Sequence, residues 1–499
     1  MKDFKQKALA GIFSHKDYLA PLRKDVYKVF HKFAYKPGIT HVYSNFTNRF
    51  NTHSNVPDNA HVMNVGLQYV MIDTLIQSWG TFFEMTPSAA VGEYSRVVNS
   101  ILGKEIPVDH LEDLHALGYL PISIKSLPEG VLVPYGVPSY TIVNTVQGYG
   151  WLVNMLETVM SAETWGISTS ATTAYAYRKR FEAEPSLNTE GIKFMGHDFS
   201  YRGAFGTQAA AMSGFGHLTS FYGSDTIPAG LFAERYYGAD FDTELVMASV
   251  DATEHSVMCS YENSGEKEAL SHLMTNVTPT GILSVVSDTW DFWQLVTEYL
   301  PELKDLIMRR DGTVVIRPDS GDPVDILTGN PLSNIEWEVK GLIECLYDIF
   351  DGTAEGSLKL LDSHIGAIYG DSITLDRQDR IITRLVAKGF VPSVVLGIGS
   401  FTYQYVTRDT HGSAVKATDV QFGTGNHVAI SKDPKTDQSK KSARGLLRVD
   451  LVDGEYTLVS DVTPEQEAGG ELKEVFRDGK LLNPTTLEEI RHLIDATFN

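Results

Sequence analysis

The sequence predicts an α/β fold: an incomplete or distorted (β/α) barrel with an additional α+β domain built from the N- and C-terminal segments. In the middle of the chain, short apolar runs rich in β-forming residues alternate with polar or glycine-rich residues and helical patterns. The N-terminal part lacks this alternation, and the C-terminal part has only isolated strand-like runs and one helix. The predicted segments are 1–188 for the α+β domain, 189–424 for the barrel, and 425–499 for a segment that packs with the first domain.

The N-terminal segment mixes long helical stretches with short strands. Helical periodicity is clear in "NVGLQYVMIDTLIQSW" (64–79) and "AVGEYSRVVNSILG" (90–103). Strand-like runs follow in "GVLVPYGVP" (130–138) and "YTIVNTV" (140–146). Because these elements do not alternate regularly, this part is predicted to form a separate α+β domain.

Five apolar runs in the middle segment are predicted to be parallel strands. They are "IKFMG" (192–196), "ILSVVS" (282–287), "TVVIRP" (313–318), "IGAIYG" (365–370) and "SVVLG" (393–397). Polar residues or glycines follow each run, namely His197, Asp198, Arg202, Asp288, Asp319, Ser320, Asp371, Gly399 and Ser400. The carboxyl ends of parallel strands converge on one mouth, so we expect these residues to share a pocket.

Helical patterns separate the predicted strands. Apolar residues recur with helical period from Ile335 to Phe350, and Ser372 or Thr374 is placed to cap a helix that ends near Gly389. Beyond residue 425, two strand-like runs in "HVAISKDPKTDQSKKSARGLLRVDLVDGEYTLVS" precede an amphipathic helix around "LEEIRHLI". This end of the chain is expected to complete the first domain.

Charge and cysteine content exclude several classes of function. The 499 residues include 42 Lys and Arg against 63 Asp and Glu, a net charge of −21 that repels nucleic acid and anionic membranes. We therefore expect no nucleic-acid partner and no membrane association. The N-terminus has no signal-peptide core, and neither Cys259 nor Cys345 has a nearby CxxC companion. These features predict a cytoplasmic protein.

The motif "VVIRPDSGDP" (314–323) places an arginine and a carboxylate at a strand end. Arg317 could grip a phosphate, and Asp319 could bind ribose hydroxyls or orient a metal; a plain strand–turn salt bridge is equally consistent. In "YGDS" (369–372), Gly370 would let the backbone approach a ligand. Asp371 could contact that ligand or simply cap a helix.

Two further signals are weaker when taken alone. "GIGS" (397–400) has the glycines and helix start of an anion cradle, but it lacks the third glycine of a dinucleotide fingerprint. A local basic tract would suit a polyphosphate or form a solvated loop; it comprises Lys416, Lys432, Lys435, Lys440, Lys441 and Arg444. His255, in "EHSVMCSY", could be a nucleophile or a structural imidazole, and spacing alone leaves both open.

Taken together, a series of ordered motifs resembles the nicotinamide phosphoribosyltransferase family, which has a type II phosphoribosyltransferase fold. The motifs are "HDFSYRG" (197–203), "YGSDTIPAG" (222–230), "ATEHS" (252–256), "SVVSDTWD" (284–291), "IRPDSGDP" (316–323), "YGD" (369–371) and "TRD" (407–409). The resemblance extends from "DVYKVFHKFAYKPG" (25–38) to "ISKDP" (430–434). It implies synthesis of nicotinamide mononucleotide and diphosphate from nicotinamide and phosphoribosyl diphosphate, with Mg²⁺, on a homodimer with shared active sites.

The resemblance also assigns roles in the base pocket. Phe199 would stack on one face of the pyridine ring and Tyr27 of the other subunit on the opposite face. Asp225 would accept a hydrogen bond from the carboxamide and repel the charge of nicotinate. Further polar contacts to the base are implied for Arg202, Ser249 and Ser284.

The remaining implied roles concern phosphate, ribose and ATP. Phosphoryl groups would be bound by Arg317 and Arg408, and the ribose by Asp319, Gly370 and Asp371. Substrate binding would also involve Gly399 and Ser400. Diphosphate or ATP would be bound by Arg49, Lys416, Lys432 and Lys440. His255, oriented by Asp288, would be phosphorylated by ATP, which couples hydrolysis to synthesis. Mg²⁺ is expected to enter mainly through the substrate diphosphate, and its protein ligands are not specified.

Departures from the family pattern qualify these roles. "GIGSF" (397–401) stands where the family more usually has a serine and three glycines, and Asp251 replaces an apolar or proline residue before the histidine. The alternatives are a nicotinate phosphoribosyltransferase, which Asp225 disfavours, a barrel glycoside hydrolase using Asp288, Asp319 and Asp371, and a catalytically silent binding homologue.

Overall fold

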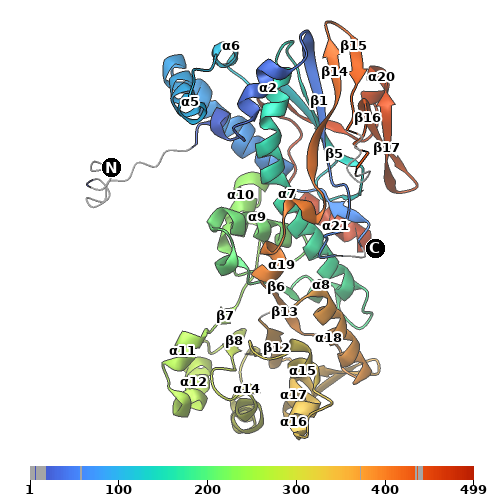
Figure 1. Cartoon of the computed structure of the whole chain (residues 1–499). Helices are drawn as coiled ribbons and strands as arrows, with labels where there is room; N and C mark the ends of the chain where they lie inside the picture. The colour runs from blue at the N-terminus through green and yellow to red at the C-terminus, as the bar shows by residue number, and fades with distance from the viewer. Residues whose placement is uncertain are drawn as a thin grey trace.

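A computed structural model describes residue 6 and residues 18–56, 59–370, 372–432, 435–436 and 442–498. Two bodies of sheet lie at opposite ends of an elongated molecule, and the long helix α7 (Gly150–Glu182) runs between them (Figure 1). The predicted site residues Asp371 and Lys440 lie outside the described residues. Over the described part of the chain, none of the helices is both long and apolar enough to cross a membrane.

A seven-stranded antiparallel sheet joins the two ends of the chain. Its order is β15 (Asn426–Ala429), β14 (Ala414–Phe422), β1 (Ile39–Thr47), β5 (Pro138–Asn144), β3 (Ile122–Ser126), β18 (Lys473–Arg477) and β19 (Lys480–Leu481). The C-terminal segment therefore packs with the N-terminal domain. Strand β14, which we had included in the barrel segment, pairs with β1, so the chain leaves the barrel before residue 414 and not at 424.

The helices of this end begin and stop where the sequence supplies capping residues. In α5 (Pro87–Leu102), the Thr86 side chain accepts a hydrogen bond from Ala89 N, Pro87 occupies the first turn, and Gly103 ends the helix with a positive φ of 65°. Other elements here are η1 (Ala20–Leu22), α2 (Lys28–Ala34), α3 (Leu67–Tyr69), η2 (Val70–Ser78), α4 (Trp79–Glu84), α6 (Asp109–Leu117), α20 (Pro464–Glu467), α21 (Leu487–Asp495), η9 (Ala496–Phe498), and the strand pairs β2 (His61–Met63) with β4 (Leu132–Pro134) and β16 (Leu446–Val452) with β17 (Glu455–Val462).

The other end is a six-stranded parallel sheet. Its order is β6 (Gly196–Asp198), β13 (Val395–Ile398), β12 (Ile365–Tyr369), β9 (Val314–Arg317), β8 (Leu283–Val286) and β7 (Asp251–Ala252). Single parallel bridges link Asp198 to Ser224 and Gly223 to Ala248, just before β7. These bridges join the two edges of the sheet into a distorted ring, which confirms the predicted incomplete barrel.

Four of the five predicted barrel strands are confirmed, and the first was wrong in its bounds. Residues 189–192 form the short helix α8 (Thr189–Ile192), because the Asn188 side chain caps it by accepting a hydrogen bond from Glu190 N. Strand β6 consequently begins at Gly196. The helix expected from residue 335 to 350 is two helices, α16 (Glu336–Lys340) and α17 (Leu342–Phe350), because Gly341 has φ 77°. Thr374 caps α18 (Leu375–Ala387), as predicted.

Helices and turns connect the strands of the ring; some pack around it and others lie beside α7 between the two bodies (Figure 1). They are η3 (Tyr201–Gly203), α9 (Thr207–Leu218), α10 (Ile227–Tyr237), α11 (His255–Cys259), η4 (Asn263–Gly265), α12 (Glu266–His272), η5 (Leu273–Val277), α13 (Phe292–Gln294), η6 (Leu295–Tyr299), α14 (Leu300–Ile307), α15 (Pro323–Thr328), α19 (Ser400–Gln404) and η7 (Arg408–Thr410), with the hairpin β10 (Gly352–Glu355) and β11 (Leu358–Leu361) at the side. Buried aliphatic residues of the strands and of α12, α14, α17 and α18 form one core.

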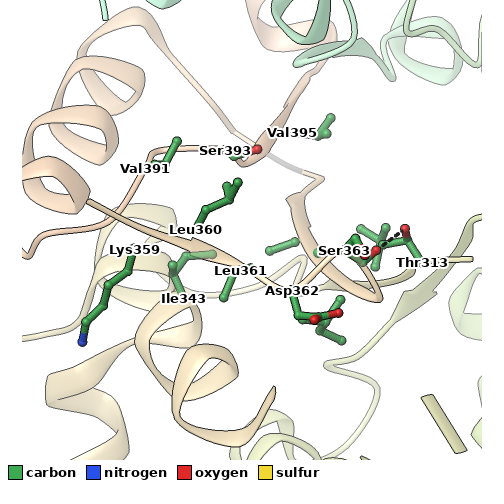
Figure 2. Close-up of a pocket in the computed structure, with 14 residues that line it drawn as sticks. Thr313, Ile343, Lys359, Leu360, Leu361, Asp362, Ser363, Val391, Ser393 and Val395 are labelled. Carbon is green, nitrogen blue, oxygen red and sulfur yellow. Dashed lines mark hydrogen bonds between the residues drawn. The ribbon is translucent and has the colours of Figure 1, made fainter. Parts of the chain in front are cut away.

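The amino ends of the barrel strands enclose a mostly apolar cavity of about 350 Å³. Figure 2 shows its lining, which includes Thr313 before β9, Leu361 of the hairpin and Val395 of β13. The Thr313 hydroxyl donates a hydrogen bond to the Ser363 carbonyl at 2.7 Å. Because this cavity is at the amino ends of the strands, it is distinct from the polar residues that follow their carboxyl ends.

Candidate active site

The carboxylate of Asp225 is the centre of a polar cluster at the carboxyl end of β6. Its backbone N–H donates to the Asp198 carbonyl at 3.0 Å, which fixes the loop beside the strand. His197 Nε2 lies 3.0 Å from Asp225 Oδ1, and Ser249 Oγ donates to the same oxygen at 2.5 Å. Partial burial raises the pKa of Asp225, but the hydrogen bonds from His197 and Ser249 outweigh it and bring the pKa below its ordinary value. The carboxylate is therefore held in its ionised form.

Phe199 lies beside this cluster, with its ring centroid 4.5 Å from that of His197. Its backbone N–H donates to the Ile398 carbonyl, which ties β6 to β13. A Cβ atom at Gly397 would lie 2.8 Å from the Phe199 ring, so glycine at 397 leaves room for the aromatic side chain. Arg202 follows in η3 and is exposed, and Ser400 at the start of α19 packs against Gly203. Phe199, Arg202 and Ser400 thus lie together near Gly397 of β13.

Arg317 at the end of β9 points into the same region. Its Nη2 donates to the Thr253 carbonyl at 2.8 Å, whereas its Nε is buried and has no hydrogen-bond partner among the described residues. Burial lowers the pKa of Arg317, while the carboxylates of Asp319, Asp225 and Asp288 oppose that effect. A guanidinium with an unpaired, buried N–H is suited to donate a hydrogen bond to an anionic group of a ligand.

Three further predicted residues lie near Arg317. A Cβ atom at Gly370, just after β12, would lie 2.7 Å from Asp319 Oδ1 and 3.6 Å from Arg317 Cδ. Ser284 of β8 is buried, and its carbonyl accepts a hydrogen bond from Thr253 N at 3.0 Å. The carboxyl ends of β9 and β12 therefore bring Asp319 and Gly370 to the mouth, as the parallel sheet predicts, whereas Ser284 lies within β8, opposite Ala252 of β7.

His255 begins the short helix α11 and lies against Asp288, which follows β8. His255 Nε2 is 3.2 Å from Asp288 Oδ1. The imidazole is 49% exposed, whereas the Asp288 carboxylate is only 6% exposed. One ring nitrogen thus meets a fixed acceptor while much of the ring remains accessible, which is the arrangement that a nucleophilic imidazole requires.

Tyr27 lies in a second group of residues on the antiparallel sheet and its helices. Partial burial and the carboxylates of Asp25 and Glu157 raise the pKa of Tyr27, and Arg408 opposes them, so these side chains lie close together. Glu157 forms ion pairs with Lys28 at 2.6 Å and Lys416 at 3.4 Å. Tyr27 itself is 61% exposed.

Arg49 and Lys432 belong to the same end of the molecule. Arg49 Nε donates to the Gly412 carbonyl at 2.7 Å, on the loop that carries Arg408. Lys432 is exposed after β15, and its backbone N–H donates to Ser442 Oγ. Among the described residues, the hydrogen bonds, ion pairs and ring contacts do not join Tyr27, Arg408 or Lys416 to Phe199 or Asp225. The predicted site residues of one chain therefore fall into two groups.

Comparison with known proteins decides the class of enzyme. The sequence profile of the Nicotinate phosphoribosyltransferase (NAPRTase) family matches residues 194–480, which is more than half of the chain. The chain belongs to this family. The prediction of a phosphoribosyltransferase is thereby confirmed, and the glycoside hydrolase alternative is excluded.

Similar proteins carry names that are narrower than the family name. The chain is 44% identical to a nicotinamide phosphoribosyltransferase of Acinetobacter baylyi, over 94% of this chain and 95% of that protein. It is 33% identical to a nicotinamide phosphoribosyltransferase of Xanthomonas campestris, over 76% of this chain and 80% of that protein. A third protein of this name, from Mycoplasma pneumoniae, is 34% identical over 65% of this chain and 71% of its own length.

Two solved structures share the fold. The nicotinate-nucleotide pyrophosphorylase of Pyrococcus furiosus superposes with a TM-score of 0.59 at 14% identity, covering 97% of each chain. Human nicotinic acid phosphoribosyltransferase superposes with a TM-score of 0.54 at 16% identity, covering 95% of this chain and 93% of the human one. At such low identity they support the fold alone, and they agree with the predicted barrel and additional domain.

Four residues of the site were given no role by sequence reasoning. His197 was noted only for its place after a strand, although it lies first in "HDFSYRG" and contacts Asp225. Thr253 was not singled out, because its carbonyl, which binds Arg317, leaves no signal in the sequence. Lys28 and Glu157 are far apart in the chain, and their pairing depends on how α2 packs against α7. Of these residues, only His197 could have been identified from the sequence, because it lies in the motif "HDFSYRG".

Proposed function

We propose that this enzyme transfers the phosphoribosyl group of phosphoribosyl diphosphate to nicotinamide, giving nicotinamide mononucleotide and diphosphate in NAD salvage. The observation that carries the proposal is the Asp225 carboxylate, ionised and fixed beside Phe199 by His197 and Ser249. An acceptor-only group at this position binds an amide N–H and repels a carboxylate. The names of the relatives at 44% and 33% identity support the same choice.

Within this proposal, the chemistry at the ribose needs little acid or base catalysis. The bond between the anomeric carbon and diphosphate breaks through an oxocarbenium-like state, and the neutral pyridine nitrogen attacks the same carbon. Arg317, with its unpaired Nε, neutralises charge on the phosphoryl groups, and Asp319 beside Gly370 addresses the ribose hydroxyls. Phe199 and Arg202 hold the base in line, so positioning supplies most of the catalysis.

Nicotinate is the second candidate for the base, because the family profile and one structural relative carry that name. A nicotinate enzyme requires a cation where the carboxylate of the substrate binds. The acceptor held by His197 and Ser249 is instead the anion of Asp225, whose pKa lies below its ordinary value. The structure therefore favours nicotinamide over nicotinate.

ATP coupling through His255 forms the next part of the proposal. Attack of an imidazole nitrogen on the γ-phosphorus of ATP breaks the bond to ADP and forms a phosphohistidine, which water later hydrolyses to phosphate. The 3.2 Å contact with buried Asp288 supports this role, because it holds one nitrogen while the ring stays half exposed. Arg49, Lys416 and Lys432 are proposed to bind ATP or diphosphate phosphates.

Mg²⁺ is proposed to enter with the diphosphate. The described part of the chain contains no group of three or more His, Cys, Asp or Glu placed to hold a metal, so substrate oxygens would supply most ligands. When bound, the ion would neutralise charge on the departing diphosphate. A reducing cytoplasm is the proposed location, and the free state of both Cys259 and Cys345 supports it.

A homodimer with shared sites is proposed to unite the two groups of residues. Tyr27, Phe30 and Phe33 on and before α2 are 61%, 63% and 47% exposed, and monomers seldom leave a row of large aromatic side chains in water. Docking of this face near the barrel mouth of a partner would bring Tyr27, Arg408 and Lys416 to the other chain's Phe199. The paired aromatics would then enclose the pyridine ring.

Product formation by the purified enzyme tests the function. Phosphoribosyl diphosphate and Mg²⁺ are supplied with nicotinamide or nicotinate in parallel, with and without ATP, and the nucleotides are separated by chromatography. We expect nicotinamide mononucleotide, formed more readily with ATP. Nicotinate mononucleotide as the main product would overturn the role of Asp225, an absent ATP effect would overturn that of His255, and no product with either base would indicate a silent homologue.

A further inference from the structure

His217, near the end of α9, is fully buried and contacts two separate parts of the barrel mouth. Its Nδ1 lies 2.7 Å from the Tyr403 hydroxyl of α19, and its Nε2 lies 2.8 Å from the Gly223 carbonyl. The Phe221 ring stacks on the imidazole, with the two ring centroids 5.2 Å apart. The imidazole is therefore held by two polar partners and one aromatic ring.

The direction of both hydrogen bonds follows from the chemistry of the partners. Burial lowers the pKa of His217 to about 4, although the nearby Asp198 carboxylate opposes this effect, so the ring is neutral near pH 7. The Gly223 carbonyl only accepts, so Nε2 carries the proton and Nδ1 is an acceptor. Burial raises the pKa of Tyr403 well above its ordinary value, and its protonated hydroxyl donates to Nδ1. A chain of two hydrogen bonds thus joins α19 to Gly223.

One end of this chain holds the loop that carries Asp225. The Gly223 carbonyl accepts a second hydrogen bond from Asp198 N at 3.1 Å, and Asp225 N donates to the Asp198 carbonyl at 3.0 Å. Gly223 also forms a parallel bridge to Ala248. The loop is therefore held against β6 by its backbone and against α9 by His217.

The other end of the chain holds α19, which supports the aromatic side of the pocket. The Ile398 carbonyl, two residues before α19, accepts a hydrogen bond from Phe199 N. Ser400, the first residue of α19, leaves no room for a Cβ atom at Gly203. Gly203 directly follows Arg202 in η3. The position of α19 therefore affects both Phe199 and Arg202.

We propose that His217 is a positioning residue for the base, because it fixes the Asp225 loop relative to α19. The inference rests on the proposed nicotinamide transfer and deepens it. Nicotinamide must meet the carboxylate and the side chains that α19 supports at the same time. Without His217 as a brace, the pocket has the right spacing for only part of the time, and the apparent affinity for nicotinamide falls in proportion to that fraction.

Tyr403→Phe is the mildest test, because it removes one hydroxyl and keeps the ring. It leaves Nδ1 of His217 buried without a donor, and the loss of such a hydrogen bond shifts an equilibrium by about tenfold. We expect the KM for nicotinamide to rise by about tenfold and kcat to stay within about twofold, because the bound base restores the spacing. The KM for phosphoribosyl diphosphate should change by less than about threefold, since Arg317, Asp319 and Gly370 belong to β9 and β12 and the loops after them.

Two control variants separate this role from a general loss of packing. Tyr237→Phe removes an equally buried hydroxyl, which donates to Glu129 at 2.8 Å. Gln404→Met removes a neighbouring hydrogen bond between α19 and α9, in which Gln404 Nε2 donates to Ser213 Oγ at 2.9 Å. Both controls lack a link to Gly223 and should keep the wild-type KM for nicotinamide, even where a thermal melt shows lower stability.

His217→Leu removes both hydrogen bonds and should raise the KM for nicotinamide at least as much as Tyr403→Phe does. In the double variant, Tyr403→Phe should add less than about twofold, because its hydroxyl acts through His217 alone. If His217→Leu does not fold, the comparison of Tyr403→Phe with its two controls decides.

Steady-state kinetics of the folded variants separates this inference from the function on which it rests. A wild-type KM for nicotinamide in Tyr403→Phe, an equal rise in Gln404→Met, or an equal rise in the KM for phosphoribosyl diphosphate overturns the role of His217 and leaves the transfer reaction intact. A wild-type enzyme without nicotinamide turnover overturns the proposed function and this inference together.

Discussion

At the scale of single residues, both hydrogen bonds to the Asp225 carboxylate reach Oδ1, and in the proposed function the other oxygen meets the base. Asp225→Asn keeps the size and shape of the side chain but turns a charged acceptor into a neutral amide. We expect the KM for nicotinamide to rise about tenfold to a hundredfold, which corresponds to the ~1.5–3 kcal/mol of a hydrogen bond to a charged group. Steady-state kinetics at saturating phosphoribosyl diphosphate measures this change.

A matched control for that substitution lies on the exposed loop after α10. Asp242→Asn makes the same chemical change at an exposed position away from the cluster. Its kinetics should equal those of the wild type. Unchanged nicotinamide kinetics in Asp225→Asn would show that Asp225 does not select the base.

His255 is the second residue whose role one substitution can test. Because its ring is half exposed, truncation leaves no buried cavity, and we expect His255→Ala to fold normally. ATP hydrolysis should be lost, and the KM for phosphoribosyl diphosphate should rise by about tenfold, a usual size for coupling between two ligands. The measurements are phosphate release, synthesis kinetics and a thermal melt.

Asp288→Asn serves as the companion variant, because it removes the charge that holds His255 while leaving the imidazole in place. It is expected to slow ATP hydrolysis without abolishing it. Normal ATP turnover in His255→Ala would return this histidine to a structural role and leave the coupling proposal without its nucleophile.

At the scale of elements, the close approach of β12 to β9 brings Gly370 and Asp319 together, where the proposed function places the ribose and phosphate groups. Gly370→Ala would place a Cβ atom 2.7 Å from Asp319 Oδ1, so the Asp319 carboxylate, which lies near Arg317, must move. Such overpacking costs about 1–3 kcal/mol, and we expect the KM for phosphoribosyl diphosphate to rise by roughly tenfold while the KM for nicotinamide changes less.

The same strand provides the control. A Cβ atom at Gly366 would meet only Val315 and Thr313 side-chain carbons at 3.6 and 3.7 Å, which are ordinary contacts. Gly366→Ala should therefore leave both KM values unchanged. Equal kinetics of the two alanine variants would contradict the assignment of Gly370 to the ribose and phosphate site.

Elements with strong local signals could be predicted from the sequence, and those that depend on distant contacts could not. Strands β8 and β9 are runs of buried Val, Leu and Ile bounded by polar residues, so their positions were predicted correctly. Strand β14 mixes apolar and polar residues and pairs with β1, more than 360 residues away, with Val415 opposite Phe46. Nothing in the local sequence specifies which sheet such a strand joins.

In the candidate site, too, residues in recognisable motifs could be predicted, and contacts between distant parts of the chain could not. The pairing of Asp288 with His255 was predicted from the family resemblance, and the two side chains lie in contact. The link from Lys28 through Glu157 to Lys416 spans helix α2, helix α7 and strand β14, and only tertiary packing brings them together. The role of Tyr27 came from family resemblance, while its distance from Phe199 in one chain is a property of the fold.

At the scale of the whole molecule, the two groups of site residues predict complementation between variants. Tyr27→Ala removes a residue of the antiparallel end, and Asp225→Ala removes one of the barrel mouth. If each active site combines the mouth of one subunit with the antiparallel end of the other, either homodimer has two defective sites. A mixed dimer would then have one site with both defects and one site with neither.

Mixing tests that prediction directly. Equal amounts of the two variants, unfolded and refolded together or coexpressed with different tags, should recover about a quarter of wild-type activity, because half of the dimers are mixed and each has one intact site. Each variant alone and a mixture of two separately folded samples are the controls. Light scattering must show dimers in every sample. Mixed dimers without recovered activity would place Tyr27 and Asp225 in the same site of one chain, and the exposed aromatic residues of α2 would then serve another contact.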